Sequence, residues 1–364
     1  MGVREIQQDR PLPPGGRYIE LPPSKPHKTV RSFCAENLLM IARLTRHQRD
    51  ILVTSCFENG CEMKISVCIT IKNSPGEKLE DLLQALKKQT RKAEEIIIID
   101  GEKTKTTIAQ GRNMAVKKAR HEIIVMTDGG CIPHSDWLAK ITKPFDDEAQ
   151  VVAGFYRMTG ESYPQKAFMP YVGVTPVSYN IKTFLPSARS IAFTKTVWKK
   201  VGSFRENLSG AGEDTAFAHD LLAKHIPIIR VKDALVDWEV PQTIIHFFIK
   251  IANYARGDVQ TKIWRYQGLF KMSHNLKILS VFVRYLAFIL LIGFSVIYRP
   301  ILPMLGILCG LYIFFPIWKA RRLSMPIQSR VLLPLVQIIS DLAVMTGVVP
   351  GIDIGSLGSI RKSA

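Results

Sequence analysis

The sequence lacks the cysteine spacings that mark zinc sites and disulfide frameworks. Its six cysteines include no Cys-x-x-Cys pair and follow no regular spacing, so neither a structural zinc site nor a disulfide-stabilised secreted domain is indicated. The N-terminal segment also lacks an apolar stretch and is rich in proline instead. We therefore expect no secretory signal there, and a soluble part that stays in a reducing, cytosolic compartment.

Acidic residues are scarce relative to basic ones. The chain has 49 Lys and Arg against 31 Asp and Glu, which gives a formal net charge of +18 at pH 7. Such a charge suits an anionic partner, which could be nucleic acid, a membrane surface or a phosphorylated ligand. The basic residues are scattered and form no aromatic-interleaved run, a pattern that favours membrane lipids and diphosphates over nucleic acid.

No glycine-rich loop follows the first predicted strand. The β-branched run from Ile65 to Thr70 predicts a buried strand, and the next residues, up to Ser74, contain no glycine. A nucleotidyltransferase with alternating strands and helices would need such a loop to bind phosphate. The sequence therefore argues against that class of enzyme.

Strands and helices alternate in the following part of the chain. Apolar residues at i, i+3, i+4 and i+7 predict helices, and short β-branched runs predict strands. The predicted elements are a helix over 79–86, a strand over 96–99, a helix over 110–119 and a strand over 123–126. Continuous apolar strands between helices predict an α/β sheet that is covered on both faces.

Polar residues follow three of these strands. They are Lys72 and Asn73, then Asp100, then Asp128. The carboxyl ends of parallel strands meet at one edge of a sheet, where ligands bind. Asp100 alone could equally be a turn or helix cap, but the three polar ends together favour a binding site.

Further elements are expected beyond a turn at Asp146 and Asp147. We expect a proline-containing loop up to Ser187 that covers one side of a cleft, and Trp238 just after a strand. The other expected elements are a strand over 151–156, a helix from 214, a strand over 226–231 and an amphipathic helix over about 243–267.

Two apolar segments near the C-terminus predict a transmembrane hairpin. They run from Leu279 to Tyr298 and from Ile301 to Trp318, and Arg284 is their only charged residue. Its long side chain can extend to the membrane interface. Basic residues flank the hairpin mainly on the side of the soluble domain, which places that domain in the cytosol.

A third apolar segment, over 331–349, is long enough to span but contains Pro334, Gln337 and Asp341. Spanning, re-entrant and interfacial placements all stay open for this segment.

Five motifs occur in a specific order along the soluble part. They are Thr70-Ile71-Lys72-Asn73, the run from Glu95 to Asp100, Gly111-Arg112-Asn113, Thr127-Asp128-Gly129-Gly130-Cys131, and the block made of 186–190, 202–206 and Gly212-Glu213-Asp214. In this order they resemble the motifs of family 2 inverting glycosyltransferases with the GT-A fold.

The resemblance implies a GT-A type, Rossmann-like mixed sheet, and it implies roles for matching residues. Asp214 would be the catalytic base, with Glu213 orienting the site. Other residues would bind the nucleotide-sugar: Thr70, Lys72, Asn73, Asp100, Arg112, Asp128 and Gly129. Arg189, Ser190 and Trp238 would bind the acceptor or the diphosphate. Arg189 could instead form an ordinary ion pair, and Trp238 could be a core residue.

Some residues depart from the family pattern. Thr70 and Ser74 stand where the family has Pro and Glu, and Gly130 replaces its second metal-facing Asp. A divalent cation, Mg²⁺ or Mn²⁺, would therefore have Asp128 as its one carboxylate ligand at that turn. Arg112, Arg189 or Lys72 could share the neutralisation of the diphosphate.

Four regions follow from these predictions. They are an N-terminal extension that is partly disordered (1–62), the GT-A domain (63–240), an amphipathic interfacial helix region (241–275), and a membrane domain with two to three transmembrane helices (276–364).

The predicted function is that of a multi-pass glycosyltransferase of the cell membrane with a cytosolic catalytic domain. A hexosyltransferase-like enzyme would move sugar from a nucleotide-sugar donor to a lipid-linked or cell-surface glycan acceptor, as in polysaccharide biosynthesis. A processive synthase and a non-catalytic nucleotide-sugar-binding protein are the alternatives. Gln260-Thr261-Lys262-Ile263-Trp264 has isoleucine where the Gln-x-x-Arg-Trp motif of processive synthases has arginine, which disfavours processive synthesis.

Overall fold

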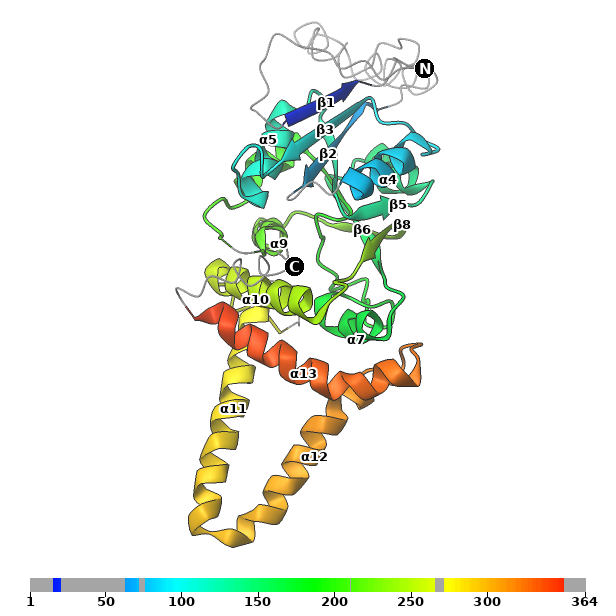
Figure 1. Cartoon of the computed structure of the whole chain (residues 1–364). Helices are drawn as coiled ribbons and strands as arrows, with labels where there is room; N and C mark the ends of the chain where they lie inside the picture. Colours follow the sequence, from blue (N-terminus) through cyan, green and yellow to red (C-terminus); the bar gives the residue numbers. More distant parts are fainter. Residues whose placement is uncertain (1–15, 21–62, 72–75, 210, 266–271, 350–364) are drawn as a thin grey trace, which may run out of the picture.

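The computed structural model of the protein describes residues 16–20, 63–71, 76–209, 211–265 and 272–349. These residues form a mixed β-sheet with helices on both faces, followed by three long apolar helices (Figure 1). The predicted fold class, a mixed α/β sheet followed by C-terminal apolar helices, is confirmed.

One eight-stranded sheet has the order β1-β3-β2-β4-β7-β6-β8-β5. The pairs β3/β2, β2/β4 and β6/β8 are parallel, and the other neighbouring pairs are antiparallel. The strands are β1 (Gly16–Glu20), β2 (Ile65–Ile71), β3 (Glu95–Asp100), β4 (Ile123–Asp128), β5 (Cys131–Pro133), β6 (Val151–Thr159), β7 (Ile191–Thr194) and β8 (Ile229–Glu239).

The parallel strands β3, β2 and β4 end at the same edge of the sheet. Ile71 at the end of β2 pairs with Asp100, and Thr70 pairs with Asp128. The expected grouping of these two aspartates beside the end of β2 is confirmed. Lys72 and Asn73 lie outside the described residues.

Helices α4 and α5 lie on opposite sides of β2 and β3 (Figure 1). The helices of the α/β part are α4 (Gly76–Lys87), α5 (Ile108–Lys118), α6 (Trp137–Thr142), the 3₁₀ helix η1 (Lys143–Asp147), α7 (Tyr163–Val172), α8 (Lys195–Val201), α9 (Glu213–Ala223) and α10 (Ile244–Thr261). The C-terminal elements are α11 (His274–Ile297), the 3₁₀ helix η2 (Arg299–Ile301), α12 (Leu302–Lys319) and α13 (Ile327–Val348).

The expected proline-containing loop is wrong in part, because α7 forms within it. Ser162 caps α7 in a capping box with Gln165, and Pro164 occupies the first turn, where a missing N–H breaks no hydrogen bond. Pro170 lies inside the helix. The prolines therefore do not prevent a helix here.

Three predicted boundaries are also wrong. The strand expected over 226–231 is β8, which begins three residues later, at Ile229, and continues to Glu239. Trp238 lies within β8, not after a strand, because Ala234, Val236 and Trp238 alternate inward along an extended chain. The amphipathic helix ends at Thr261, since Lys262 adopts a left-handed conformation with φ of 55°.

Three described helices are long and apolar enough to cross a membrane, and they comprise His274–Ile297, Arg299–Lys319 and Ile327–Val348. The first two match the predicted hairpin and project away from the sheet (Figure 1). The Arg284 guanidinium donates to Asp341 of α13 at 2.7 Å. The sequence alone does not reveal this partner.

The N-terminal extension contributes to the sheet. Within 1–62, residues Gly16–Glu20 form β1, which pairs antiparallel with β3 at the edge of the sheet. The other residues of this extension, like residues 350–364 at the C-terminal end, lie outside the described residues.

Candidate functional site

Arg112 joins two acidic residues from distant parts of the chain. Its Nη2 donates to Asp128 Oδ1 at 2.8 Å, and its Nη1 donates to Glu213 Oε1. Arg112 and Glu213 are 101 residues apart in sequence, and both are buried. The guanidinium therefore connects the end of β4 to the start of α9.

Two glycines allow these elements to meet. A Cβ on Gly111 would lie 2.9 Å from Thr70 Cγ2, so α5 packs against the end of β2 at a distance that leaves no room for a side chain. Gly212 has a φ of 118°, which glycine adopts without strain, and α9 begins directly after it. Glu213 and Asp214 thus occupy the first turn of α9, where the helix dipole favours negative charge.

The pKa values of Asp128 and Glu213 are shifted in opposite directions. Burial alone would raise the pKa of Asp128, but Arg112 and Arg189 hold it below its ordinary value. Burial raises the pKa of Glu213, and the neighbouring Asp214 adds to this effect while Arg112 opposes it. Asp128 is therefore the carboxylate whose negative charge the site stabilises.

Asp214 has its own hydrogen-bond partners. The Ser187 hydroxyl donates to Asp214 Oδ2 at 3.1 Å, and the Thr215 backbone N–H donates to Oδ1 at 2.8 Å. Arg189 Nη1 in turn donates to the Ser187 oxygen at 3.1 Å. A continuous hydrogen-bonded chain therefore leads from Arg189 through Ser187 to Asp214.

Arg189 lies against aromatic rings. Its Cζ is 4.1 Å from the ring centroid of Trp238 and 5.0 Å from that of Tyr156, and its Nη2 donates to the Tyr254 hydroxyl at 2.8 Å. Lys250 Nζ lies 4.6 Å from the Trp238 centroid. Aromatic rings and hydrogen bonds to hydroxyl groups thus hold the Arg189 guanidinium close to Asp214. Trp238 belongs to the same cluster.

Ser190 is not part of this cluster. Its hydroxyl is buried, donates to the Ala234 carbonyl at 3.1 Å and accepts from Trp137 Nε1 at 2.8 Å. Both bonds lie within the packing between β7, β8 and α6. The structure thus separates Ser190 from Arg189, although the two are adjacent in sequence.

Asp100 caps its own turn. Its Oδ1 accepts from the backbone N–H groups of Glu102 and Lys103 at 3.0 and 3.3 Å. Asp100 is thus a turn cap, which was the alternative to nucleotide binding that its sequence context allowed.

Thr70 and Gly129 lie together at the end of β2. Thr70 Oγ1 is buried with no hydrogen-bond partner among the described residues. A Cβ on Gly129 would lie 2.2 Å from Ile71 Cγ2, so any side chain there would force Ile71 to shift. The two residues keep the predicted position beside Asp128.

Sequence reasoning missed several members of the cluster. Ser187, Tyr156, Tyr254 and Lys250 were assigned no role, and Asn113 was named only as part of a motif. Asn113 Nδ2 donates to the Phe204 carbonyl at 2.8 Å and to Glu206 Oε1 at 2.7 Å, so the Arg-Asn motif is tied to the segment before α9. The adjacency of Ser187 to Arg189 within one motif is the signal that could have found Ser187.

The carboxylates here do not build a metal site by themselves. No group of three His, Cys, Asp or Glu side chains that could hold a metal ion occurs among the described residues. One oxygen of Asp128 already accepts from Arg112, and Glu213 Oε1 accepts from the same guanidinium. The second oxygen of Asp128 is the remaining protein ligand at that turn, and the adjacent cation opposes a divalent ion.

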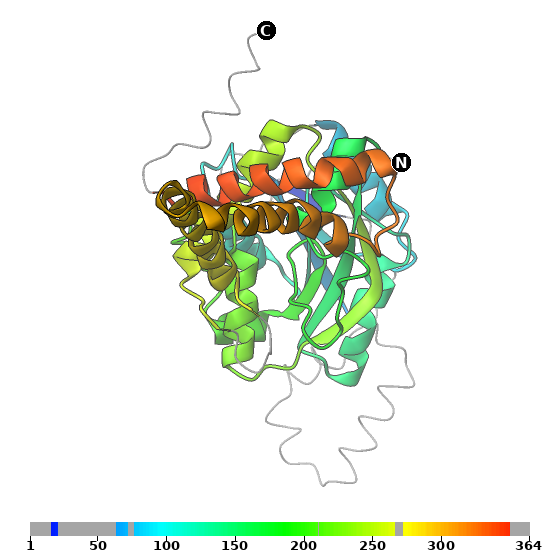
Figure 2. The same ribbon diagram turned by 90° about the horizontal axis from the view of Figure 1, so that it is seen from below.

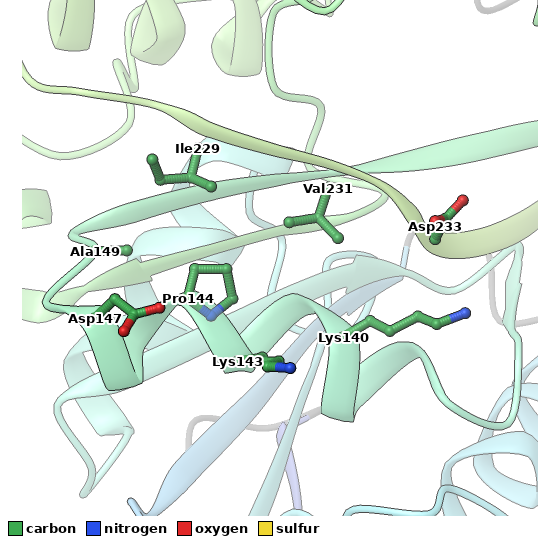
Figure 3. A pocket seen from close by; sticks show the side chains of 8 residues that line it. All are labelled: Lys140, Lys143, Pro144, Asp147, Ala149, Ile229, Val231 and Asp233. Atoms are coloured by element: carbon green, nitrogen blue, oxygen red, sulfur yellow. The ribbon is translucent and has the colours of Figure 1, made fainter.

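A separate hollow of about 440 Å³ lies between the α6–η1 segment and β8 (Figure 3). Its lining residues are Lys140, Lys143, Pro144, Asp147, Ala149, Ile229, Val231 and Asp233. None of them belongs to the motifs, so this hollow is not part of the candidate site.

No protein-family model matches the chain, and no curated protein matches its sequence. Similar solved structures include S. aureus TarS 1–349 in complex with UDP, with 19% identity and a TM-score of 0.37 over 55% of this chain and 67% of that one. The same TarS fragment in complex with UDP-GlcNAc has 18% identity and a TM-score of 0.39 over 55% and 68%. The mannosyltransferase PcManGT from Pyrobaculum calidifontis, in complex with GDP-Man and Mn²⁺, has 13% identity and a TM-score of 0.43 over 83% of this chain and 88% of that one. These similarities are too low to assign a family or an activity to the chain.

Proposed function

We propose that the protein is a membrane-bound inverting glycosyltransferase with the GT-A fold. The observation that carries the proposal is the bridge made by Arg112 between Asp128 and Glu213. This bridge brings together three of the motifs on which the resemblance rests. Residues that matched the motifs only by chance would not be expected to meet in one partly buried cluster.

Asp214 is the proposed general base. It would take the proton of an acceptor hydroxyl while the acceptor oxygen forms a bond to the anomeric carbon of the sugar. The bond from that carbon to the diphosphate breaks, and its electron pair leaves with the nucleoside diphosphate. A positioned base of this kind contributes about 10²- to 10⁴-fold to rate, and Ser187 would hold the carboxylate in place.

Positive charge near the leaving diphosphate would come from arginine. Arg189 lies beside the Asp214 group and is held by Ser187 and Tyr254. A guanidinium matches phosphate oxygens in geometry and stays charged. Arg112 has both terminal nitrogens occupied by Asp128 and Glu213, so its proposed role is to hold the donor-side carboxylate rather than to bind phosphate directly.

The Mg²⁺ or Mn²⁺ that the sequence resemblance implies has a poor fit to these residues. A divalent cation neutralises a leaving diphosphate when it is bound. Asp128 would be its carboxylate ligand, but Arg112 already shares that carboxylate. In the proposed reaction, the positive charge beside the diphosphate therefore comes from Arg189.

The remaining predicted residues take roles on the donor and acceptor sides. Thr70, Asp100, Asp128 and Gly129 would bind the nucleotide-sugar. Trp238 is buried and would hold Arg189 in place beside the diphosphate. The proposed acceptor is a lipid-linked or glycan molecule at the cytosolic face of the cell membrane, because the apolar helices follow the catalytic domain directly. Transfer of one sugar is favoured over processive synthesis, because isoleucine stands at position 263, where the Gln-x-x-Arg-Trp motif has arginine.

The test is Asp214→Asn in the full chain, with turnover and donor binding measured separately on a panel of UDP, GDP and dTDP sugars. We expect turnover to fall by about 10²- to 10⁴-fold while donor binding is retained. The matched control is Asp136→Asn, the same chemical change at an exposed carboxylate that pairs with Lys140. Full turnover by the Asp214 variant, or no sugar transfer or donor hydrolysis by the unaltered protein with any donor in the presence of lipid acceptors, would overturn the proposal.

A further inference from the structure

The helix α13 differs from the hairpin helices in how much of it the protein covers. Of the most apolar window of α13, 33% is buried within the structure, compared with 11% for α11 and 6% for the segment that contains α12. A helix that crosses a bilayer beside a hairpin needs no such cover from a soluble domain. The length and apolar composition of α13 alone therefore do not show that it spans the membrane.

The direction of α13 also differs from that of the hairpin. Figure 1 shows α11 and α12 projecting away from the sheet, whereas α13 crosses beneath α10 and α7. Seen from below, α13 again runs across the α/β part (Figure 2). The Tyr171 hydroxyl on α7 donates to the Leu333 carbonyl of α13 at 3.2 Å, which fixes this crossing.

The two faces of α13 have different surroundings. One face is buried and includes Ser329, Leu333, Val336, Ala343 and Gly347. The opposite face is exposed and apolar, and it comprises Ile327, Val331, Leu335, Ile338 and Leu342, which recur every three or four residues. We call these five residues the apolar stripe. The stripe lies on the side of α13 opposite the buried face.

Residues typical of a membrane surface precede the stripe. Arg321 Cζ lies 4.1 Å from the centroid of the Trp318 ring at the end of α12, and tryptophan is enriched at headgroup level. Lys319, Arg321 and Arg322 are exposed in the same connection. Their charge suits anionic lipid headgroups, so α13 begins where α12 reaches the membrane surface.

Polar side chains tie α13 to both hairpin helices. Asp341 Oδ2 accepts from Arg284 Nη2 of α11 and from the Tyr312 hydroxyl of α12, each at 2.7 Å. Asp341 Oδ1 accepts from Gln337 at 2.9 Å. Gln337 and Asp341 thus face the hairpin helices, and none of the five residues of the stripe is polar.

Close backbone contacts continue from α13 to the candidate site. A Cβ on Gly347 would lie 2.2 Å from the Ala252 carbonyl oxygen of α10, and a Cβ on Gly257 of α10 would lie 1.2 Å from the Ala211 carbonyl oxygen. Ala211 is followed by Gly212 and the acidic pair of α9. Close contacts therefore connect α13, through α10, to the segment directly before Glu213 and Asp214.

From these contacts we propose that α13 lies in the plane of the membrane surface, with the apolar stripe in the lipid and the opposite face under α10 and α7. The hairpin enters the bilayer from the same surface. In this placement, α13 keeps Asp214 and the residues bonded to it close to the membrane surface. An in-plane helix of this kind buries its apolar face about 5–10 Å into the boundary of headgroups and acyl chains. This placement holds whether or not the chain transfers a sugar.

The test measures membrane depth along α13 in the full chain, reconstituted in vesicles of phosphatidylcholine and phosphatidylglycerol. A nitroxide amino acid is introduced at one position at a time, at 331, 335 or 342, and depth is read from its relative accessibility to oxygen and to a water-soluble nickel chelate. Positions 335 and 342 are about 10 Å apart along a helix axis. We expect equal depths for the three labels, all within the lipid.

Labels at Leu286 and Leu290 of α11 are the matched reference, because both side chains are exposed and α11 enters the bilayer. They are expected to differ in depth by about 6 Å. A difference of about 10 Å between 335 and 342 would show that α13 spans and would overturn the proposal. Labels that report water at all three positions would overturn it as well.

A reporter fused after the last residue gives an independent readout. An in-plane α13 keeps the C-terminus on the same side of the membrane as the catalytic domain. A protease that digests the reporter only from the opposite side would contradict the proposal. Neither measurement depends on sugar transfer, so failure of this placement and failure of the proposed activity can be distinguished.

Discussion

The hydroxyl of Ser187 donates a hydrogen bond to the carboxylate of Asp214, with 3.1 Å between Oγ and Oδ2. The same hydroxyl oxygen accepts from Arg189 Nη1. Because a serine hydroxyl has one proton, the bond from Arg189 orients that proton toward Asp214. Ser187 is thus a positioning residue for the proposed base.

Replacement of this hydroxyl should impair turnover more than binding. Ser187→Ala leaves Asp214 without its side-chain donor, so we expect kcat to fall by about 10- to 100-fold, the loss typical of hydrogen-bond partners that orient metal-binding side chains. KM for the donor should change little. Steady-state kinetics would check this, with Ser135→Ala, an exposed serine on the loop before α6, as control. Equal losses in the two variants would contradict the positioning role.

Ser190 should behave in the opposite way. Ser190→Ala leaves the buried Trp137 Nε1 donor without its acceptor, which typically lowers the free energy of unfolding by about 1–3 kcal/mol. Thermal unfolding should shift to lower temperature, while turnover per folded molecule stays close to that of the unaltered protein. A variant with normal stability and lost turnover would instead place Ser190 in the acceptor site.

The strands of the sheet were predictable because their apolar runs are continuous. The predicted strands at 65–70, 96–99 and 123–126 each lie within the observed β2, β3 and β4. A buried parallel strand is apolar on both faces, so its pattern needs no partner to be recognised. The helix α7 was missed because prolines usually end helices, and its capping box around Ser162 outweighs that signal.

The site was predictable as a set of residue types but not as a set of contacts. Asp128, Glu213 and Asp214 were named from motifs, yet the bridge through Arg112 depends on how α5 packs on β2. Ser187 and Ser190 were indistinguishable in sequence, and the short turn between them sends one hydroxyl to Asp214 and the other into the core. Contacts between residues so distant in sequence depend on the complete fold.

Acid should remove the stabilising contribution of Asp128. Its pKa in the folded protein lies below the ordinary 3.8, so between these two values the unfolded chain binds more protons and stability rises with pH. The contribution is complete above the ordinary pKa and is lost as pH falls through the folded value. Asp128→Asn lacks it at every pH.

We therefore expect the unaltered protein to unfold at a higher temperature than Asp128→Asn above about pH 4, and the difference to shrink as the pH falls toward 2. Thermal unfolding of both proteins in the same detergent from pH 2 to 6 would check this. Asp128 contributes to the raised pKa of Glu213, so both proteins carry Glu213→Gln in this comparison and that carboxyl does not titrate in either. A difference that is independent of pH would contradict an ionised Asp128 in the folded state.

Restoring a second carboxylate beside Asp128 should create the metal affinity that the described residues do not provide. A Cβ on Gly130 would meet nothing within 4 Å, so Gly130→Asp has room for its side chain. Two carboxylates at one turn give a hard cation a second oxygen ligand, and affinity rises with ligand charge. We expect Mn²⁺ to bind this variant on the order of tenfold more tightly than the unaltered protein.

Titration of Mn²⁺ followed by electron paramagnetic resonance, without nucleotide present, would measure this directly. Gly130→Asn is the matched control, because it adds nearly the same volume without the charge, and it should bind Mn²⁺ no better than the unaltered protein. Chelation of metal should reduce turnover of Gly130→Asp more than that of the unaltered chain if the new site captures a cation near the diphosphate. Tight Mn²⁺ binding by the unaltered protein, unchanged in Gly130→Asp, would mean that Asp128 already holds a metal despite its pairing with Arg112.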